Sequence, residues 1–484
     1  MKSSVTSTLW HDIAAATADL GPEATALRIP LWVELREPPH SWRKRAGAIA
    51  AACSQFLTIS RKTGKLSPHG RVLFCFPHRT PSNVHNLLPV AREALRRGLL
   101  GGILTMDDLS AELHEFAGRI PIVSAREIIG QLSFKDRVRN VFTVARTYKR
   151  ITEVLARNLP GFRLTGRRAM LIRMQADSIL YGLVCEQLLD VWLPKCVITT
   201  SDFWPLEHQL CRQASNRQIT SLIVQHGTID YIWWPFVADL YCMWGTAHVE
   251  QMRDIGAPLE RMMVLGMPAT DKLFERTDAA SQRPPRNSSQ SVCLLLSMTN
   301  GRSAEPEIFR KYRKFLDNVI RLIPSITWKV KLHPVEDQSF YREMGEDICT
   351  RLIFHPKQVT LEEAVNDADV VSTIYSTAGM EAMVMDRPLI VAPATDRIKE
   401  LAWWPAMGGG TYTDTAEEFQ MQWKKLTTDP GYRTRQLDEQ RKFLSRSFAN
   451  QGHAAERIVD LLEQYSDQAP HGHSPARVLS SENP

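Results

Sequence analysis

The sequence predicts an α/β protein made of two doubly wound, Rossmann-like domains. Short apolar, β-branched runs alternate with helical patterns along nearly the whole chain, which is typical of parallel α/β folds. The length of 484 residues is too great for one compact core and suggests two domains. Residues 275–290 include Pro284, Pro285 and Asn287 and almost no apolar side chain, which is the composition of a linker.

The apolar runs predict ten strands, with helices in the intervals between them. Two longer helical stretches, 136–158 and 171–190, interrupt the first set of strands. The predicted strands lie near 71–76, 101–105, 120–124, 196–200, 219–225, 291–297, 326–332, 351–354, 369–373 and 388–392.

This pattern predicts how the chain divides. We expect an N-terminal domain over residues 1–274, a linker over 275–290 and a C-terminal domain over 291–465. Residues 466–484 are rich in Ser, Pro and His and are predicted to be a disordered tail. The two domains are expected to face one another across a cleft, with ligands at the carboxyl ends of the strands.

Composition and charge narrow the class of partner. A hydrophobic fraction of 44% and a charged fraction of 23% exclude disordered and fibrous classes. The net charge is +6, but residues 1–165 carry 24 Lys/Arg against 13 Asp/Glu, a local balance of +11. This asymmetry indicates either an anionic partner, such as a phosphorylated lipid, an acidic glycan or a membrane surface, or simply a basic solvated surface. Nucleic acid is disfavoured, because the basic residues are scattered and do not alternate with aromatic ones.

The cysteines and the first residues indicate a cytoplasmic protein without a metal site. The eight cysteines form no Cys-x-x-Cys pair, and most lie in apolar runs, so we expect buried free thiols and no zinc. Residues 1–12 lack an apolar signal core. Residues 41–60 fit a basic amphipathic helix that would rest on the inner face of the plasma membrane, or equally a core helix with charged ends.

Polar residues follow four strands of the predicted C-terminal domain. They are Arg302 after the first strand, His333 and His355 after the next two, and the segment from Ser372 to Glu381 after the fourth. In that segment Ser376 and Thr377 begin a helix, whose hydroxyl and backbone N–H groups suit a phosphate, and Gly379 would allow a close approach. The alternative is that Ser376 and Thr377 only cap the helix.

The predicted N-terminal domain has acid–base candidates at its strand ends. Asp202 follows the strand near 196–200, His226 follows the strand near 219–225, and His78 follows the first strand. Histidine and aspartate serve as general bases, so we expect at least one of Asp202 and His226 to be functional. Each could instead tie down a loop. The chain contains no P-loop, no Gly-x-Gly-x-x-Gly fingerprint and no His-Glu-x-x-His motif.

Several short motifs resemble those of GT-B-fold glycosyltransferases that build bacterial capsules and surface polysaccharides. In the N-terminal half they are Gln225-His226-Gly227, Trp244-Gly245, Gly256-Ala257-Pro258 and Gly266-Met267-Pro268. In the C-terminal half they are Lys331-Leu332-His333-Pro334, the Ser372–Glu381 segment and Asp386-Arg387-Pro388. Polysialyltransferases, Kdo transferases and CDP-glycerol glycerophosphotransferases share such a His-Pro motif and such a Ser/Thr motif.

The resemblance implies roles for these residues. His333 would contact the donor phosphate, Ser372, Ser376 and Thr377 would bind the same phosphate, and Glu381 would reach the ribose. The N-terminal domain would bind the acceptor and supply the base. Arg302 and His355 are expected to take part in donor binding because of their places at strand ends, apart from the resemblance. The acidic base motif of the sialyltransferases is not evident, so the base remains open between Asp202 and His226. The position eight before Glu381 is Thr373 rather than the glutamate of many retaining members, which favours inversion.

The expected function is therefore transfer of a sugar or glycerophosphate from a nucleotide-activated donor to a glycan or lipid-linked acceptor, without a metal or other cofactor. Two alternatives remain: a UDP-sugar 2-epimerase of similar fold, and a non-catalytic GT-B-like scaffold in a polysaccharide assembly complex. The expected location is the cytoplasm, with peripheral association at the inner membrane as a further possibility.

Overall fold

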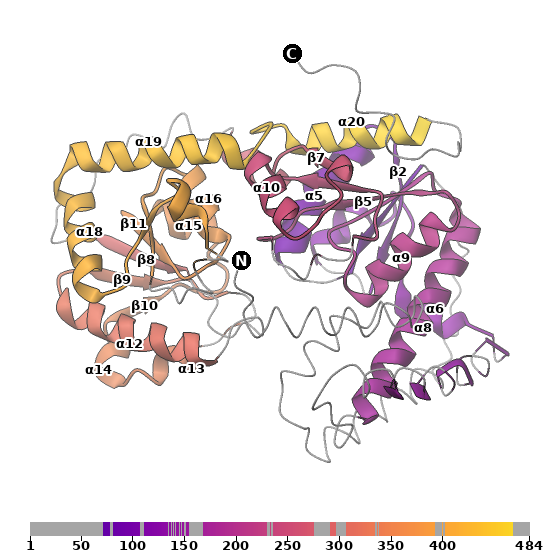
Figure 1. Cartoon of the computed structure of the whole chain (residues 1–484), viewed down its shortest axis with the longest axis horizontal. Coiled ribbons are helices and arrows are strands. Elements are labelled where there is room, and N and C mark those ends of the chain that lie inside the picture. The colour runs from indigo at the N-terminus through magenta and orange to yellow at the C-terminus, as the bar shows by residue number, and fades with distance from the viewer. Residues whose placement is uncertain are drawn as a thin grey trace. The chain divides into compact units, whose positions relative to one another are not determined.

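The computed structural model describes most of residues 71–467 in two compact units (Figure 1). Of the described residues, the first unit contains those within 71–243, 248–265 and 455–467, and the second contains those within 244–247 and 266–454. The described part leaves out 78–80, 107–110, 134, single positions from 137 to 151, 154–167, 230–232, 234–235, 275–290, 297–305, 334–335, 337, 393–398 and 400–401, in addition to 1–70 and 468–484.

The first unit is built on a seven-stranded sheet in the order β3-β2-β1-β4-β5-β6-β7. All of its strand pairs are parallel. The chain runs outward from β1 to β3 and then returns to the other side of β1, so the strand order reverses between β1 and β4. The strands are β1 (Val72–Phe76), β2 (Leu100–Thr105), β3 (Ile122–Ser124), β4 (Cys196–Thr199), β5 (Thr220–Val224), β6 (Leu240–Met243) and β7 (Met262–Val264).

Helices cover both faces of this sheet, because alternate residues of its central strand point to opposite sides. Val72, Phe74 and Phe76 of β1 belong to one apolar cluster, and Leu73 and Cys75 belong to another. The helical segments around this sheet are α5 (Pro81–Arg96), η1 (Ala111–Phe116), α6 (Ala125–Gln131), α8 (Arg168–Trp192), α9 (Pro205–Ser215), α10 (Thr246–Asp254), η3 (Leu259–Arg261) and α20 (Ala454–Asp467).

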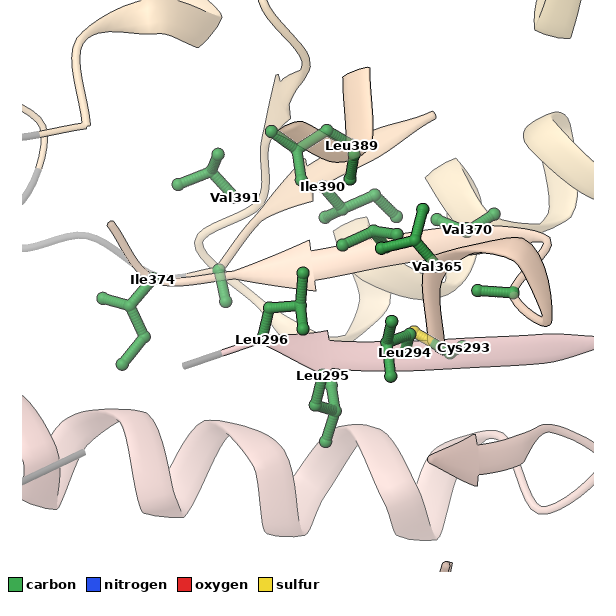
Figure 2. Close-up of a cluster of buried hydrophobic side chains, with 14 of the residues drawn as sticks. Cys293, Leu294, Leu295, Leu296, Val365, Val370, Ile374, Leu389, Ile390 and Val391 are labelled. Carbon is green, nitrogen blue, oxygen red and sulfur yellow. The ribbon is translucent and has the colours of Figure 1, made fainter. Parts of the chain in front are cut away.

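The second unit is built on a six-stranded parallel sheet in the order β10-β9-β8-β11-β12-β13. It repeats the same arrangement, with the reversal between β8 and β11. Figure 2 shows the fully buried side chains of β8 alternating between its two faces, with Leu295 opposite Leu294 and Leu296. The strands are β8 (Val292–Leu296), β9 (Thr327–Val330), β10 (Leu352–Phe354), β11 (Val370–Thr373), β12 (Leu389–Val391) and β13 (Thr411–Tyr412).

Helices also surround the second sheet. Phe419 of α18 packs against Phe315 of α12 and Trp328 of β9, so these two helices share one apolar core. The helical segments are η4 (Pro268–Thr270), α12 (Pro306–Leu322), α13 (Ser339–Arg342), α14 (Glu346–Cys349), α15 (Leu361–Asn366), α16 (Ala378–Val384), η6 (Trp404–Met407), α18 (Ala416–Thr428) and α19 (Pro430–Ser447).

The ten predicted strands are confirmed, with ends that differ by at most two residues. Three observed strands were not predicted: β6, β7 and β13. They are short, with four, three and two residues, so they carry too few alternating positions to be told from loops by pattern alone. The predicted linker, the tail from residue 468 onward and the amphipathic stretch 41–60 lie outside the described residues.

The final helix corrects the predicted domain boundaries. Residues 455–465 were expected in the C-terminal domain, and the first domain was expected to end at residue 274. Instead the first unit ends its main run at Leu265, and residues from Ala455 onward return to it. In Figure 1, α20 lies over the sheet of the first unit. Ile458 and Leu462 are fully buried in the same cluster as β1, and Arg97 at the end of α5 forms a 2.6 Å ion pair with Asp460.

We expect Ile458→Ala to destabilise the first unit alone. Removing a fully buried isoleucine side chain costs about 2–5 kcal/mol in unfolding free energy. Hydrogen–deuterium exchange should therefore become faster in β1 and β4 while the amides of β8 and β11 keep their protection. The exposed Gln464→Ala on the same helix serves as the control and should change neither. Faster exchange in β8 and β11 with β1 unaffected would contradict the assignment of α20.

Candidate functional site

The reversal of strand order in the first unit places the end of β4 at the position where doubly wound sheets bind ligands. Thr200, Ser201 and Asp202 follow this strand, and α9 begins directly after them at Pro205. Proline suits the first helical position because its missing N–H would have no partner there. The preceding Trp204 is extended, with φ −83° and ψ 151°, as residues before proline prefer. The local sequence thus dictates a sharp strand-to-helix turn.

Asp202 is fully buried and joins this turn to the segment before β6. Its Oδ2 accepts hydrogen bonds from the backbone N–H groups of Val237 at 2.7 Å and Ala238 at 3.1 Å. The Tyr241 hydroxyl donates to the same oxygen. Burial raises the pKa of Asp202, although these three hydrogen bonds act in the opposite direction. A carboxyl group so enclosed braces the backbone and has little access to a substrate.

Glu207 lies in the first turn of α9 and was not among the predicted site residues. It is fully buried, and its Oε1 accepts a hydrogen bond from the Ser201 hydroxyl at 2.9 Å. Burial raises the pKa of Glu207 to about 8, and the nearby Asp202 carboxylate adds to the shift. The side chain is therefore mainly protonated at neutral pH. The sequence feature that could have indicated Glu207 is the polar run Glu207-His208-Gln209, which interrupts a helix that is otherwise apolar on the side facing the sheet.

His226 lies after β5, the neighbour of β4, and is half-buried. Its Nδ1–H donates a hydrogen bond to the Thr200 carbonyl at 2.6 Å, so the lone pair of the neutral ring would lie on Nε2. The imidazole ring lies 6.0 Å from the Phe203 ring and 5.6 Å from the Trp233 ring, measured between centroids. The ring is thus oriented by a backbone carbonyl on one side and by aromatic packing on the other.

The first unit therefore brings Asp202 and His226 to adjacent strand ends but gives them different environments. His208 adds a third contact, since its Nδ1 donates to the Asp202 carbonyl at 3.0 Å. Of the predicted acid–base candidates, the described residues present only His226 in a half-buried position with an oriented ring. His78 lies outside the described residues.

The second unit has its reversal between β8 and β11. The loop after β8, with Arg302, lies outside the described residues. At the end of β11, the Thr373 hydroxyl donates to the Leu296 carbonyl and so ties the two strand ends together. The Thr373 oxygen in turn accepts a hydrogen bond from the Ser376 backbone N–H at 3.1 Å. These bonds fix the turn that leads into α16.

Within this turn the hydroxyl groups have different surroundings. The Ser376 hydroxyl accepts from the Ala378 backbone N–H at 3.3 Å, so it caps the helix. Thr377 occupies the N-cap position, yet its side chain makes no capping hydrogen bond. Ser372 lies one residue before the end of β11 and is fully buried, so its side chain does not share the strand end with Ser376 and Thr377.

Glu381 lies one helical turn beyond Thr377 and is half-buried. Burial raises the pKa of its carboxyl group to about 7. Gly379 beside it is fully covered: a Cβ atom there would lie 3.0 Å from Thr373 Cγ2 and 3.2 Å from Leu389 Cδ2. The sequence suggested that this glycine lets a ligand approach, but in the structure it lets α16 pack closely on β11 and β12.

His333 and His355 follow β9 and β10 and are both half-buried. Burial lowers the pKa of each, and the charges of Lys329 and Lys331 lower that of His355 further. The His333 backbone N–H donates to Glu336 Oε2 at 3.1 Å, which holds the loop after β9. With strands about 4.8 Å apart, the His333 backbone lies roughly 10 Å from the end of β11, and His355, on the edge strand, lies further away.

The described residues were also considered for a metal site and for a membrane-spanning helix, and they contain neither. No group of three or more His, Cys, Asp or Glu side chains in the described part of the chain is arranged to hold a metal ion. No helix within that part is long and apolar enough to cross a membrane.

No protein-family model and no curated protein matches the sequence. Solved structures with similar folds include Staphylococcus aureus MnaA with UDP, at 16% identity and a TM-score of 0.51, covering 82% of this chain and 96% of that one. A putative UDP-N-acetylglucosamine 2-epimerase from Listeria monocytogenes is 13% identical with a TM-score of 0.53, and the match covers 82% of this chain and 96% of that one. UDP-GlcNAc 2-epimerase from Neisseria meningitidis, bound to UDP-GlcNAc, is 14% identical with a TM-score of 0.52, and the match covers 81% of this chain and 100% of that one.

These likenesses, together with the two doubly wound parallel sheets, confirm the predicted fold class of two Rossmann-like units of the GT-B type. At identities of 13–16% they concern the fold and leave the substrate of this chain open.

We expect Glu207→Gln to change how stability depends on pH. The unfolded chain releases this proton near the ordinary pKa of 4.5, whereas the folded protein keeps it up to about 8. Glu207 therefore lowers the unfolding free energy as pH rises from about 5 to 8, by at most about 1.4 kcal/mol per pH unit. The uncharged glutamine removes this slope. Urea unfolding of both proteins at pH 5, 6, 7 and 8 should show the variant gaining relative stability as pH rises. The control Glu260→Gln, at an exposed position, should show no such gain. A difference in unfolding free energy between Glu207→Gln and the parent protein that stays constant with pH would contradict the raised pKa.

Proposed function

We propose that this chain is a glycosyltransferase that moves a sugar or glycerophosphate from a nucleotide-activated donor to a glycan or lipid-linked acceptor in surface-polysaccharide synthesis. The observation that carries the proposal is His226, a half-buried imidazole whose Nδ1 is occupied by the Thr200 carbonyl and whose Nε2 carries the lone pair. A single oriented base is what transfer to a hydroxyl requires. The two buried carboxyls beside it, Asp202 and Glu207, support the turn rather than the chemistry.

The second unit would bind the donor. Thr377, at the start of α16, lies at the reversal of the strand order, where phosphates bind in doubly wound sheets. His333 follows β9, two strands away, and its side chain can donate to a phosphate oxygen. Glu381, one turn into α16, can accept hydrogen bonds from ribose hydroxyls. Arg302 follows β8 in the sequence, between these elements, and would add a bidentate cation.

These groups account for the proton and for the negative charge that move during the reaction. In sugar transfer, the acceptor hydroxyl oxygen attacks the anomeric carbon from the side opposite the leaving group, and its proton passes to Nε2 of His226. The bond from the anomeric carbon to the phosphate oxygen breaks, and its electron pair stays on the nucleotide. Thr377, His333 and Arg302 stabilise the negative charge that develops there. Configuration at the anomeric carbon is inverted.

A UDP-sugar 2-epimerase is the second candidate, because the similar structures from Listeria and Neisseria are described as such enzymes. That activity would use the same nucleotide site and no acceptor. It would exchange the proton at C2 of the sugar with solvent, so incorporation of deuterium from D₂O at C2, without an acceptor, distinguishes it from transfer. Saturable nucleotide binding with neither product would instead favour a non-catalytic scaffold.

Donor binding is expected to depend on the residues beside β11. Thermal-shift titrations with CMP, CDP, UDP, UMP, GDP and ADP should find a nucleotide that raises Tm. His333→Ala and Ser376→Ala should weaken binding of that nucleotide about tenfold or more. The His333 side chain and the Ser376 O–H, whose oxygen accepts from the Ala378 N–H, would each donate a hydrogen bond to phosphate. Each shift is measured against the variant's own unliganded Tm, since Ser376 also caps α16.

His355→Ala is the matched control, because this histidine also follows a strand but lies at the sheet edge. It should retain most of the affinity. Equal affinity in all four proteins would contradict the proposed donor site.

Catalysis should depend on His226 separately from binding. His226→Asn removes the base, and we expect kcat to fall about 10²–10⁴-fold while nucleotide affinity stays unchanged. The rate of product formation at saturating donor measures kcat, and the thermal-shift titration measures nucleotide affinity. The exposed His114→Asn controls for histidine replacement elsewhere in the same unit. A His226→Asn enzyme with full kcat would rule out this base.

A further inference from the structure

The described residues between 135 and 153 form a helix on the first unit whose two faces are unusual. Ser133 begins it: its Oγ accepts a hydrogen bond from the Asp136 backbone N–H at 3.1 Å, as an N-cap does. Near its other end the Thr152 hydroxyl donates back to the Tyr148 carbonyl at 2.9 Å. The segment is therefore a defined helix and presents fixed faces.

Among the described residues of this helix, the buried positions are mostly polar. Asn140, Val144 and Thr152 are the buried positions, and Val144 packs in a small cluster with Ala176 and Ile179 of α8. The spacing of four and eight residues puts these three positions on one side of the helix. Val144 is the only apolar residue among these three described positions.

The outward face carries apolar side chains. Lys135, Val138, Phe142, Arg146 and Lys149 are all exposed, and their spacings of three or four residues align them in one stripe, which we call the outer stripe. Phe142 is 71% exposed, the most exposed large hydrophobic residue in the described part of the chain, and Val138 is 37% exposed. A helix of a soluble protein normally shows the opposite pattern, with apolar residues inward.

Charge accompanies the exposed aromatic ring. In the sequence, residues 135–153 contain six Lys/Arg and two Asp/Glu, a balance of +4 in a chain whose total is +6. Lys149 forms only a long ion pair, 4.0 Å from Glu153, and its side chain is 82% exposed. Lys135 and Arg146 flank the apolar pair on either side along the outer stripe.

We propose that the outer stripe binds the surface of an anionic lipid bilayer, with Phe142 and Val138 inserted between headgroups and the cations beside anionic lipids. Each Lys or Arg near such a surface adds about 1 kcal/mol of attraction, and an exposed aromatic ring suits the interfacial region. A second copy of the chain is a poorer occupant, because a symmetric contact would place like charges together. Two apolar side chains also give far less area than a stable protein interface.

This inference deepens the proposed function, because a lipid-linked acceptor lies in such a surface, and it rests on that function only in this respect. Its test needs no turnover. The full chain is sedimented with vesicles of phosphatidylcholine alone or with about 30% phosphatidylglycerol, at low and high salt. We expect binding to the anionic vesicles that weakens with salt. Failure here would leave the nucleotide titration unaffected, so the two proposals fail separately.

Three variants locate the contact. Phe142→Ser should reduce vesicle binding at least fivefold, Phe142→Leu should keep most of it, and the pair Arg146→Glu with Lys149→Glu should reduce it about tenfold or more and abolish its salt dependence. These residues are exposed, so folding should be unaffected. The controls are Leu193→Asn, another exposed apolar residue, and Lys195→Glu, an exposed cation of the same unit.

Several results would overturn the proposal. Unchanged vesicle binding by Phe142→Ser, or equal losses in the two control variants, would show that the outer stripe is not the contact. Binding of the chain to single-stranded RNA with none to vesicles would assign the cations to nucleic acid. A dimer in light scattering that Phe142→Ser converts to a monomer, with no vesicle binding, would make the stripe an interface between copies.

Discussion

Both units depend on one constraint: their central strands are buried on two faces. The side chains of β1 and β8 have almost no contact with water on either side, so helices must cover both faces of each sheet. Chemistry is then confined to the strand ends, where the backbone leaves the sheet. The reversals at β1/β4 and β8/β11 determine which ends are open, because helices diverge to opposite faces there. The candidate residues follow these strands or their neighbours for that reason.

The polar groups at these ends have two kinds of role, separated by burial. Asp202 and Glu207 lie wholly inside the first unit, and they connect segments that are distant in sequence, as Asp202 does with Val237 and Tyr241. Buried carboxyls are costly unless they are hydrogen-bonded or neutral, and both solutions occur here. His226, in contrast, is half-buried, and its ring is hydrogen-bonded to the Thr200 carbonyl, in the same turn as Asp202. An acid–base residue needs such a fixed orientation.

The sequence was sufficient for the strands but only partly for the site. Runs such as Val292–Leu296 predict a buried strand by themselves, and a residue after such a strand must lie at its end. Whether Asp202 is accessible depends on Val237 and Tyr241, 35 and 39 residues away, which no local pattern reveals. Glu207 was missed because it lies within a helix rather than at a strand end. The helix over 136–158 was predicted, but periodicity did not show that Phe142 would point outward.

The return of α20 to the first unit also affects the order in which the protein can form during synthesis. The second unit is in effect an insertion, because residues 266–454 stand between two parts of the first unit. All of its segments have left the ribosome once Ala454 is exposed, whereas the first sheet still lacks the side chains of Ile458 and Leu462 that cover it. The unit that begins first along the chain is thus completed last. Until then the apolar surface that Ile458 and Leu462 cover is exposed, and exposed apolar surface promotes aggregation during folding.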